Sequence, residues 1–156
     1  MSAVYLYDDA LARTFEPFAL TRPIGELRAG ALLVRERWAR ALGADVAGHI
    51  GAAILAGFEE TRSAPMIGAA TLPAGSWIVN ARFAPALDRA PKSDLLHADG
   101  RVAAVRIDRE LSSDALADGS FELDSFSLQG AAPGAVGGWW MEGVWDYVRH
   151  LVAMLE

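Results

Sequence analysis

Residues able to bind phosphate gather near the start of the chain, in a loop that contains two prolines. Arg13, Thr21 and Arg22 come just before the longest helical pattern of the sequence. The free N–H groups and positive dipole end of a helix N-terminus attract phosphate, and guanidinium groups add paired donors. The loop therefore predicts a phosphate site with Arg13 and Arg22 as candidate catalytic residues. Composition alone favours the alternative, in which both arginines form surface ion pairs.

Acidic and amide side chains follow two short apolar runs that read as buried strands. Asp8 and Asp9 end the run AVYLY, and Asn80 and Arg82 follow SWIV. Ligands of open α/β sheets lie beyond the carboxyl ends of strands, which places these four residues at a crevice. Asn80 could then hydrogen-bond a sugar or nucleotide, and Arg82 could contact a phosphate. Turn or helix-capping roles explain the aspartates and Asn80 equally well.

The elements that must position these residues include one amphipathic helix within the stretch 27–43. Apolar residues recur there at helical spacing, and Gly43 is suited to end the helix because it accepts positive φ. Pro17 and Pro23 predict that the preceding segment is an ordered loop. The apolar face consists of Leu27, Ala31, Val34, Trp38 and Leu42, with Glu26, Arg28, Arg35, Glu36 and Arg40 opposite.

The rest of the chain contains weaker signals. Asp99-Gly100 predicts a hairpin over 95–107, and the imperfect alternation over 121–128 predicts an edge strand. Residues 129–138 read as a flexible linker, or alternatively a lid, before a terminal helix. That helix carries Val144, Val148, Leu151 and Leu155 on one face, which we expect to pack or dock. His49 lacks neighbours at metal-binding spacing and is interpreted as structural.

Length and composition restrict the class of protein. The 156 residues suggest a single domain over 1–156, and 53% apolar residues exclude a disordered chain. A net charge of −6 disfavours nucleic-acid binding, and 0 cysteines exclude a thiolate nucleophile. No apolar run reaches the roughly 20 residues of a membrane helix, and no secretory signal is present, so we expect a cytoplasmic location without membrane attachment.

Three segments together resemble the GlmU-like sugar nucleotidyltransferases. The first, LYDDALARTFEPFALTRPIGELRAGALLVRERWARALG, is similar to the start of the N-terminal domain of that family. WIVNARFAPALD resembles its strand with an Asn-Gly-Arg segment, and GVWDYVRHLVAM resembles the Trp-Asp helix at its domain end. The matching residues of the first segment are Asp8, Asp9, Arg13, Pro17, Thr21, Arg22, Pro23, Glu26, Leu27, Arg28, Gly30, Arg35, Glu36 and Trp38.

The resemblance implies an α/β fold with a Rossmann-like, nucleotidyltransferase-type sheet and flanking helices, in a compact or truncated version. It implies a reaction of a nucleoside triphosphate with a sugar 1-phosphate, giving a nucleotide sugar such as UDP-N-acetylglucosamine. Mg²⁺ would be the cofactor, held with the help of Asp8 or Asp9. Phosphates would be bound by Arg13 and Arg22, and the substrate-binding residues would be Thr21, Glu26, Arg28, Asn80 and Arg82.

The sequence departs from the wider superfamily in ways that support an alternative function. The first strand is followed by DDALAR without a glycine, and the only lysine of the chain is Lys92. Bare backbone and a lysine normally contact the nucleotide phosphates in such proteins. The alternative is a catalytically degenerate module that binds a nucleotide sugar or assembles with a partner. Family members usually continue into a left-handed β-helix, which is the expected partner domain.

Overall fold

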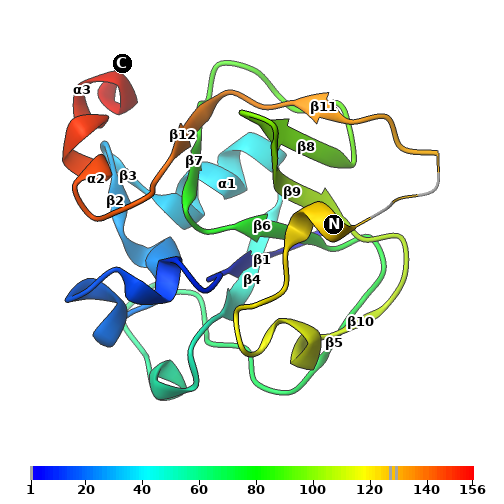
Figure 1. Ribbon diagram of the computed structural model, residues 1–156, viewed down its shortest axis with the longest axis horizontal. Helices are drawn as coiled ribbons and strands as arrows, with labels where there is room; N and C mark the ends of the chain where they lie inside the picture. Colours follow the sequence, from blue (N-terminus) through cyan, green and yellow to red (C-terminus); the bar gives the residue numbers. More distant parts are fainter. Residues whose placement is uncertain (1, 127, 129) are drawn as a thin grey trace.

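The computed structural model describes residues 2–126, 128 and 130–156 and centres on one mixed sheet (Figure 1). Its strands are β1 (Ala3–Tyr7), β4 (Asp45–Ile50), β6 (Trp77–Asn80), β8 (Leu95–Ala98), β9 (Arg101–Arg106) and β11 (Gly134–Ala135). These six strands lie in the order β11-β8-β9-β6-β1-β4. β1 is parallel to both β4 and β6, whereas β9 runs antiparallel to β6 and β8. This mixed α/β architecture with few helices confirms the expected fold class.

The remaining elements are short and surround the sheet. The helices are α1 (Val34–Leu42), α2 (Asp146–Arg149) and α3 (Leu151–Leu155). Three two-stranded pairs are β2 (Arg28–Ala29) with β3 (Leu32–Leu33), β5 (Thr71–Leu72) with β10 (Leu111–Ser112), and β7 (Phe83–Pro85) with β12 (Gly138–Trp140). Single 3₁₀ turns are η1 (Ala12–Thr14), η2 (Phe18–Leu20), η3 (Ile24–Glu26), η4 (Ala53–Leu55), η5 (Ser113–Leu116) and η6 (Leu123–Ser125).

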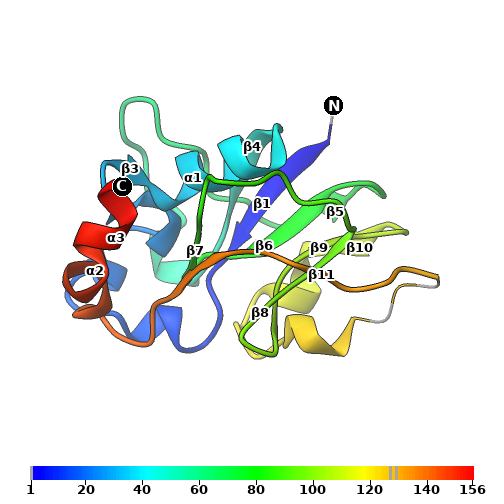
Figure 2. The ribbon, with the colours of Figure 1, turned by 90° about the horizontal axis from the view of Figure 1, so that it is seen from above.

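Both faces of the sheet are covered, because its central strands are apolar on both sides. Trp38 of α1 is fully buried in one core cluster together with Leu6. Ile78 and Leu116 belong to a second cluster on the other face. Figure 2 shows α1 on one side of the sheet and the segment with η5 and η6 on the opposite side. The apolar runs of β1 and β6 are thus explained by burial on two faces.

The chain order creates a switch point at the carboxyl ends of two parallel strands. From β1 the chain passes through α1 to β4 on one side, and it returns as β6 on the other side of β1. Tyr7 of β1 is in register with Asn80 of β6, so the two strands end side by side. In open α/β sheets such a reversal of strand order leaves a crevice for ligands.

The amphipathic helix is shorter than the sequence pattern predicts. Residues 28–33 form the β2–β3 hairpin instead of helix, and α1 begins at Val34. Gly30 adopts a φ of 71°, which turns the chain between the two strands. The prediction for the other end is confirmed, because Gly43 ends the helix with a φ of 59°. The spacing of apolar residues reports only local periodicity, so it does not reveal a tertiary contact that favours a hairpin.

A substitution at Gly30 should destabilise the fold. A Cβ at this position would lie 2.6 Å from the carbonyl oxygen of Met154 and 2.9 Å from a guanidinium nitrogen of Arg37. We expect Gly30→Ala to lower the free energy of unfolding by about 2–4 kcal/mol, from positive φ plus the clash. The matched control is Gly43→Ala, where a Cβ meets nothing within 4 Å and only the cost of a positive φ applies. Urea unfolding compares the variants, and equal losses would contradict the clash.

Of the two strand predictions for segments 95–107 and 121–128, the structure confirms the first and contradicts the second. The hairpin over 95–107 is confirmed, since Asp99 and Gly100 have φ values of 52° and 75°. The expected edge strand over 121–128 is wrong, because Leu123–Ser125 form η6 and Ser127 lies outside the described residues. The Asp124 carboxylate accepts the Val102 N–H at 2.7 Å. A side chain, rather than another strand, thus satisfies this backbone donor of β9.

The segment 129–138 contains paired backbone among its described residues, and Gln129 lies outside them. Gly134–Ala135 forms β11 parallel to β8, and the Val136 N–H donates to the His97 carbonyl at 3.0 Å. Gly138 begins β12, which pairs with β7. These contacts bring the segment onto the sheet, and its flexibility stays a prediction.

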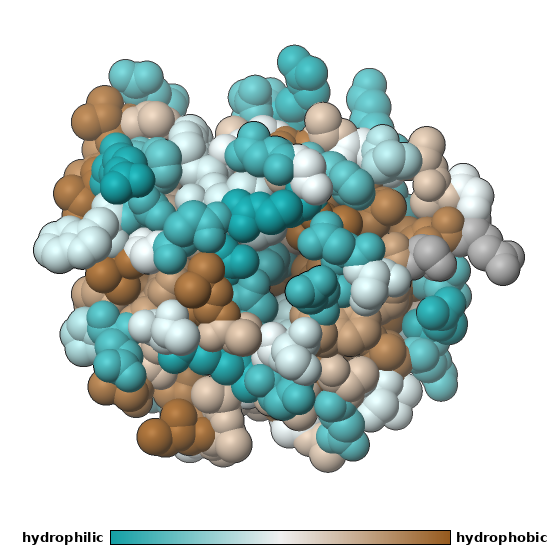
Figure 3. Space-filling view, viewed as in Figure 1, coloured by the Kyte–Doolittle hydropathy of each residue, from teal (hydrophilic) through white to brown (hydrophobic). Residues whose placement is uncertain are grey.

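The terminal helix does not bury the face that its periodicity predicts. Val148, Leu151 and Leu155 are exposed, whereas Met154 is buried in the core cluster beside α1. The helix is interrupted at His150, which ends α2 and precedes α3, so the helical phase changes. Apolar side chains accordingly gather at the left edge of Figure 3, over these helices. Among the described residues, no helix has the length and apolarity needed to cross a membrane.

Candidate functional site

A cavity of about 290 Å³ lies beyond the carboxyl ends of β1 and β6, at the switch point of the sheet. Figure 3 shows hydrophilic side chains around a hollow near the centre of this face. The walls come from both strands, from the start of β9, from the turn before η6 and from β12. The lining residues are Tyr7, Asp9, Ala10, Leu11, Asn80, Arg82, Arg101, Val102, Gly119, Ser120, Phe121, Glu122, Leu123, Asp124 and Trp140.

Asp9, Asn80 and Arg82 form one network on the strand side of this cavity. Arg82 donates to Asp9 through Nε at 2.9 and 3.0 Å and through Nη2 at 2.8 Å. The Asn80 amide donates to the same carboxylate at 3.0 Å, and its oxygen accepts the Arg82 N–H at 2.9 Å. The structure therefore brings together three of the residues that the sequence marked. Two strand ends that are far apart in the chain supply them.

Asp9 is ionised in this network at neutral pH. Burial by itself raises its pKa, but the hydrogen bonds and charge of Arg82 outweigh burial and hold the pKa below the ordinary value. Oδ1 of Asp9 also accepts the Ala12 N–H at 2.9 Å. Both carboxylate oxygens thus have partners within the chain. Asp9 acts here as an anchor that orients the Arg82 guanidinium.

A second arginine and an indole complete the cavity wall. The Arg101 guanidinium carbon lies 4.0 Å from the ring centroid of Trp140, and that of Arg82 lies 5.4 Å from it. Trp140 is held by a hydrogen bond from its Nε1 to the Ala98 carbonyl at 2.9 Å. Glu142 forms ion pairs with both arginines. Sequence reasoning missed Arg101, because its one local signal is its place directly after the Asp99-Gly100 turn.

Asp8 faces away from this network into the protein. It is 2% exposed, and its Oδ2 accepts the Ile24 N–H at 3.2 Å. Its Oδ1 is buried without a hydrogen-bond partner among the described residues. Burial raises the pKa of Asp8 to about 7. The carboxyl is therefore partly protonated at neutral pH.

These two aspartates do not fit a Mg²⁺ site held by the protein. Both oxygens of Asp9 are bonded to protein donors, and a cation there would lie beside the Arg82 guanidinium. Asp8 is buried and poorly ionised, whereas Mg²⁺ requires accessible charged oxygens. No group of three or more His, Asp and Glu residues in the described part of the chain could hold a metal ion. We expect no binding of Mg²⁺ by itself in calorimetry.

The raised pKa of Asp8 predicts a pH-dependent stability. Its folded pKa of about 7 exceeds the ordinary 3.8, so the folded state binds more protons between these values. Stability from this group therefore falls as pH rises through the window and becomes constant above it. We expect Asp8→Asn to remove a slope of up to about 1.4 kcal/mol per pH unit. Urea unfolding of both proteins across the window measures the difference, and parallel profiles would contradict the assignment.

The residues predicted in the proline-containing loop have other partners. Arg13 donates to the Asp8 carbonyl at 2.9 Å and also to the carbonyls of Ala117 and Leu116. Arg22 forms an ion pair with Glu60, and neither arginine lines the cavity. The Thr21 hydroxyl donates to the Phe18 carbonyl at 3.3 Å. A phosphate role for Arg13, Thr21 and Arg22 stays a prediction.

Glu26 and Arg28 also lie outside the cavity lining. Glu26 is 4% exposed, and its Oε1 contacts His49 Nε2 and Arg35 Nε, each at 2.8 Å. Arg28 is exposed and donates to the Ala31 carbonyl at 2.8 Å. The substrate-binding roles proposed for Glu26 and Arg28 thus remain predictions. The contacts of His49 agree with its interpretation as a structural residue.

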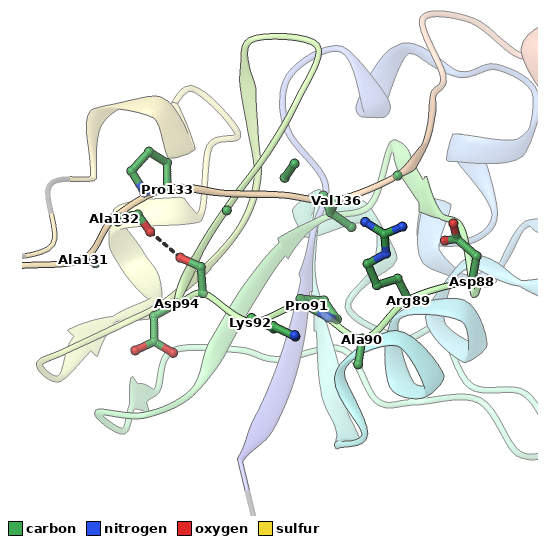
Figure 4. A pocket seen from close by; sticks show the side chains of 14 residues that line it. Asp88, Arg89, Ala90, Pro91, Lys92, Asp94, Ala131, Ala132, Pro133 and Val136 are labelled. Carbon is green, nitrogen blue, oxygen red and sulfur yellow. Dashed lines mark hydrogen bonds between the residues drawn. The ribbon is translucent and has the colours of Figure 1, made fainter.

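A larger cavity of about 840 Å³ lies between segments 88–94 and 131–137 (Figure 4). Small side chains and backbone form most of its wall, and the Ser93 hydroxyl donates to the Ala132 carbonyl at one end. Figure 4 shows Arg89 and Asp94 pointing away from each other. Lys92, the single lysine, also lies here. The charged groups do not converge, so the smaller cavity is the better candidate for a binding site.

Comparisons with known proteins place the chain in a family. No curated protein matches the sequence significantly. The crystal structure of HddC from Yersinia pseudotuberculosis is similar at 12% identity and a TM-score of 0.39, over 98% of this chain and 99% of that chain. This similarity is too distant to indicate a ligand. The GlmU-like subfamily stays a prediction. A family model described as sugar nucleotidyl transferase matches residues 4–156, and the chain therefore belongs to the sugar nucleotidyl transferase family.

Proposed function

We propose that the cavity beyond β1 and β6 binds a nucleoside triphosphate and a sugar 1-phosphate and supports their conversion to a nucleotide sugar. The family implies a nucleotide and a sugar phosphate as substrates. The observation that carries the proposal is the convergence of Asp9, Asn80 and Arg82 at the switch point. UDP-N-acetylglucosamine is the product that we propose.

The two arginines and the one asparagine of the cavity suit the chemistry of this reaction. An oxygen of the sugar phosphate attacks the α-phosphorus, the bond from that phosphorus to the β-phosphate oxygen breaks, and pyrophosphate leaves. Such a reaction depends on positioning and charge neutralisation rather than on a protein nucleophile. Arg82, oriented by Asp9, and Arg101 provide positive charge at the cavity. The Asn80 side chain fixes the Arg82 backbone through its oxygen.

The first test is calorimetry with UTP, UDP-N-acetylglucosamine and dTDP-sugars, with and without Mg²⁺. Saturable binding, followed by release of pyrophosphate from UTP only when N-acetylglucosamine 1-phosphate is present, is the expected result. Pyrophosphate release with dTTP but not UTP would reject the proposed product while retaining the reaction class. If none of these compounds binds, the proposal is rejected.

A second candidate is a module that binds a nucleotide sugar without turnover. It is favoured by the contacts of Arg13, whose three nitrogens all donate to backbone carbonyls of the chain. These bonds hold the guanidinium of Arg13 at the segment around η5, outside the lining of the cavity. Binding of UDP-N-acetylglucosamine without pyrophosphate release would support the module. Its assembly with a left-handed β-helix domain stays part of this candidate.

A further inference from the structure

The two arginines of the cavity lie close to one aromatic ring, and an acidic side chain compensates their charge. Both guanidinium carbons lie within 5.4 Å of the Trp140 ring centroid. Asp9 pairs with Arg82 but not with Arg101 among the described contacts. Glu142 is the carboxylate that bridges them, through Oε2 to Arg82 and Oε1 to Arg101. The bridge therefore occupies a position suited to a bound anion.

Two features of the Glu142 bridge would allow a bound anion to displace it. The Glu142 side chain is 52% exposed, and its contact with Arg82 is 3.3 Å long. Arg82 is otherwise fixed by Asp9 and by a hydrogen bond from Nη1 to the Met141 carbonyl at 3.1 Å. Arg82 would therefore stay in place if the Glu142 side chain moved into solvent. An exposed ion pair of this kind contributes little stability, so an incoming anion loses little by replacing it.

We propose that Arg82 and Arg101 form a phosphate site that Glu142 closes in the unliganded protein. A phosphate or diphosphate group enters by exchanging with the Glu142 carboxylate, which swings into solvent. When Glu142 moves away, Arg82 keeps Asp9 as its partner, whereas Arg101 has no other carboxylate partner in the described ion pairs. Phosphate oxygens offer the same acceptors as the carboxylate and more charge. This inference rests on the proposed function, because it assigns the two arginines to the phosphates of the nucleotide. Binding of an anion by itself does not require turnover.

Glu142 competes with a bound anion for Arg82 and Arg101, so removing the charge of Glu142 should strengthen anion binding. The apparent affinity of a site is proportional to the fraction of molecules in which the site is open. We expect Glu142→Gln to bind inorganic pyrophosphate about threefold to fivefold more tightly than the wild type by calorimetry at fixed ionic strength. Arg101→Ala in the same background should abolish the gain. Circular dichroism establishes that each variant is folded.

Glu122→Gln is the matched control, because Glu122 is an exposed carboxylate in the lining of the cavity and contacts neither arginine in the ion pairs described. It measures the effect of removing one negative charge nearby. Equal gains in Glu142→Gln and Glu122→Gln, or no gain in Glu142→Gln, would overturn the competitor role. Pyrophosphate release from UTP is assayed on the same proteins. Tighter pyrophosphate binding without any turnover would retain the anion site and reject the proposed transferase.

Discussion

Replacing Arg82 with alanine should weaken binding of UTP by at least about 30-fold, because a buried, hydrogen-bonded charge contributes about 2–5 kcal/mol at a recognition site. The guanidinium lies at the cavity with 8% of its side chain exposed and is oriented by Asp9. Its loss removes positive charge and also frees the Asp9 carboxylate to repel phosphate. Calorimetry with UTP measures the effect, and circular dichroism at the same temperature shows whether the variant is folded.

Two further variants sharpen this prediction. Arg109→Ala removes an exposed arginine whose contact is with the neighbouring Asp108, and UTP binding should stay within about twofold of the wild type. Arg82→Lys keeps the charge but cannot reproduce the paired contacts to Asp9, so intermediate binding is expected. Normal UTP affinity in a folded Arg82→Ala protein would remove this cavity from consideration as the nucleotide site.

The same assay decides the role that the sequence assigns to Arg22. Its guanidinium pairs with Glu60 at the surface and does not line the cavity. We therefore expect Arg22→Ala to weaken UTP binding much less than Arg82→Ala does. Loss of binding of equal size would extend the site to the proline-containing loop.

Replacing Glu26 with alanine should have the largest effect on stability, lowering the free energy of unfolding by about 3–5 kcal/mol. Its Oε1 contacts His49, Arg35 and the Ala64 N–H within 3.2 Å. Burial raises the pKa of Glu26, but the hydrogen bonds from His49 and Arg35 outweigh burial and lower it, so the carboxylate is charged. Alanine would leave these donors buried without an acceptor. Urea unfolding followed by circular dichroism measures the loss.

Glu60→Ala is the contrasting variant, because it also removes a carboxylate from an arginine pair. Its side chain is 44% exposed, and we expect a loss of about 0–1 kcal/mol. If Glu26→Ala is insoluble, Glu26→Gln retains an acceptor and allows the measurement with a smaller loss. Losses of the same size for Glu26→Gln and Glu60→Ala would show that the buried cluster contributes no more than a surface pair.

Glu26 has two candidate roles, one in substrate binding and one in stability. The sequence placed it among substrate-binding candidates, and the structure surrounds it with buried donors from β4, α1 and the loop before Pro65. UTP binding by folded Glu26→Gln separates the two roles. Unchanged affinity indicates a purely structural residue, and loss of affinity restores the binding role.

Local sequence patterns are enough to predict the parts of the fold that depend on neighbouring residues. The apolar runs before Asp8 and Asn80 are buried strands, and Asp99-Gly100 turns a hairpin as predicted. Gly43 ends α1 because its backbone conformation is available to glycine at little cost. These are local rules, and the convergence of Asp9 with Asn80 and Arg82 follows from one further general rule on parallel strands.

The partners of individual side chains, in contrast, follow from the three-dimensional arrangement of the elements. Asp8 and Asp9 are adjacent in sequence, yet one is buried beneath η3 and the other binds Arg82, because successive residues after a strand point in different directions. Arg13 and Arg82 were both site candidates from the sequence, but Arg13 donates hydrogen bonds to backbone carbonyls of the segment around η5. Arg101 contacts Trp140 and Glu142 because the β8–β9 hairpin lies close to β12 in the fold. These elements are far apart in the sequence, so the sequence does not reveal the contact. Partners of this kind depend on long-range packing, which local spacing does not encode.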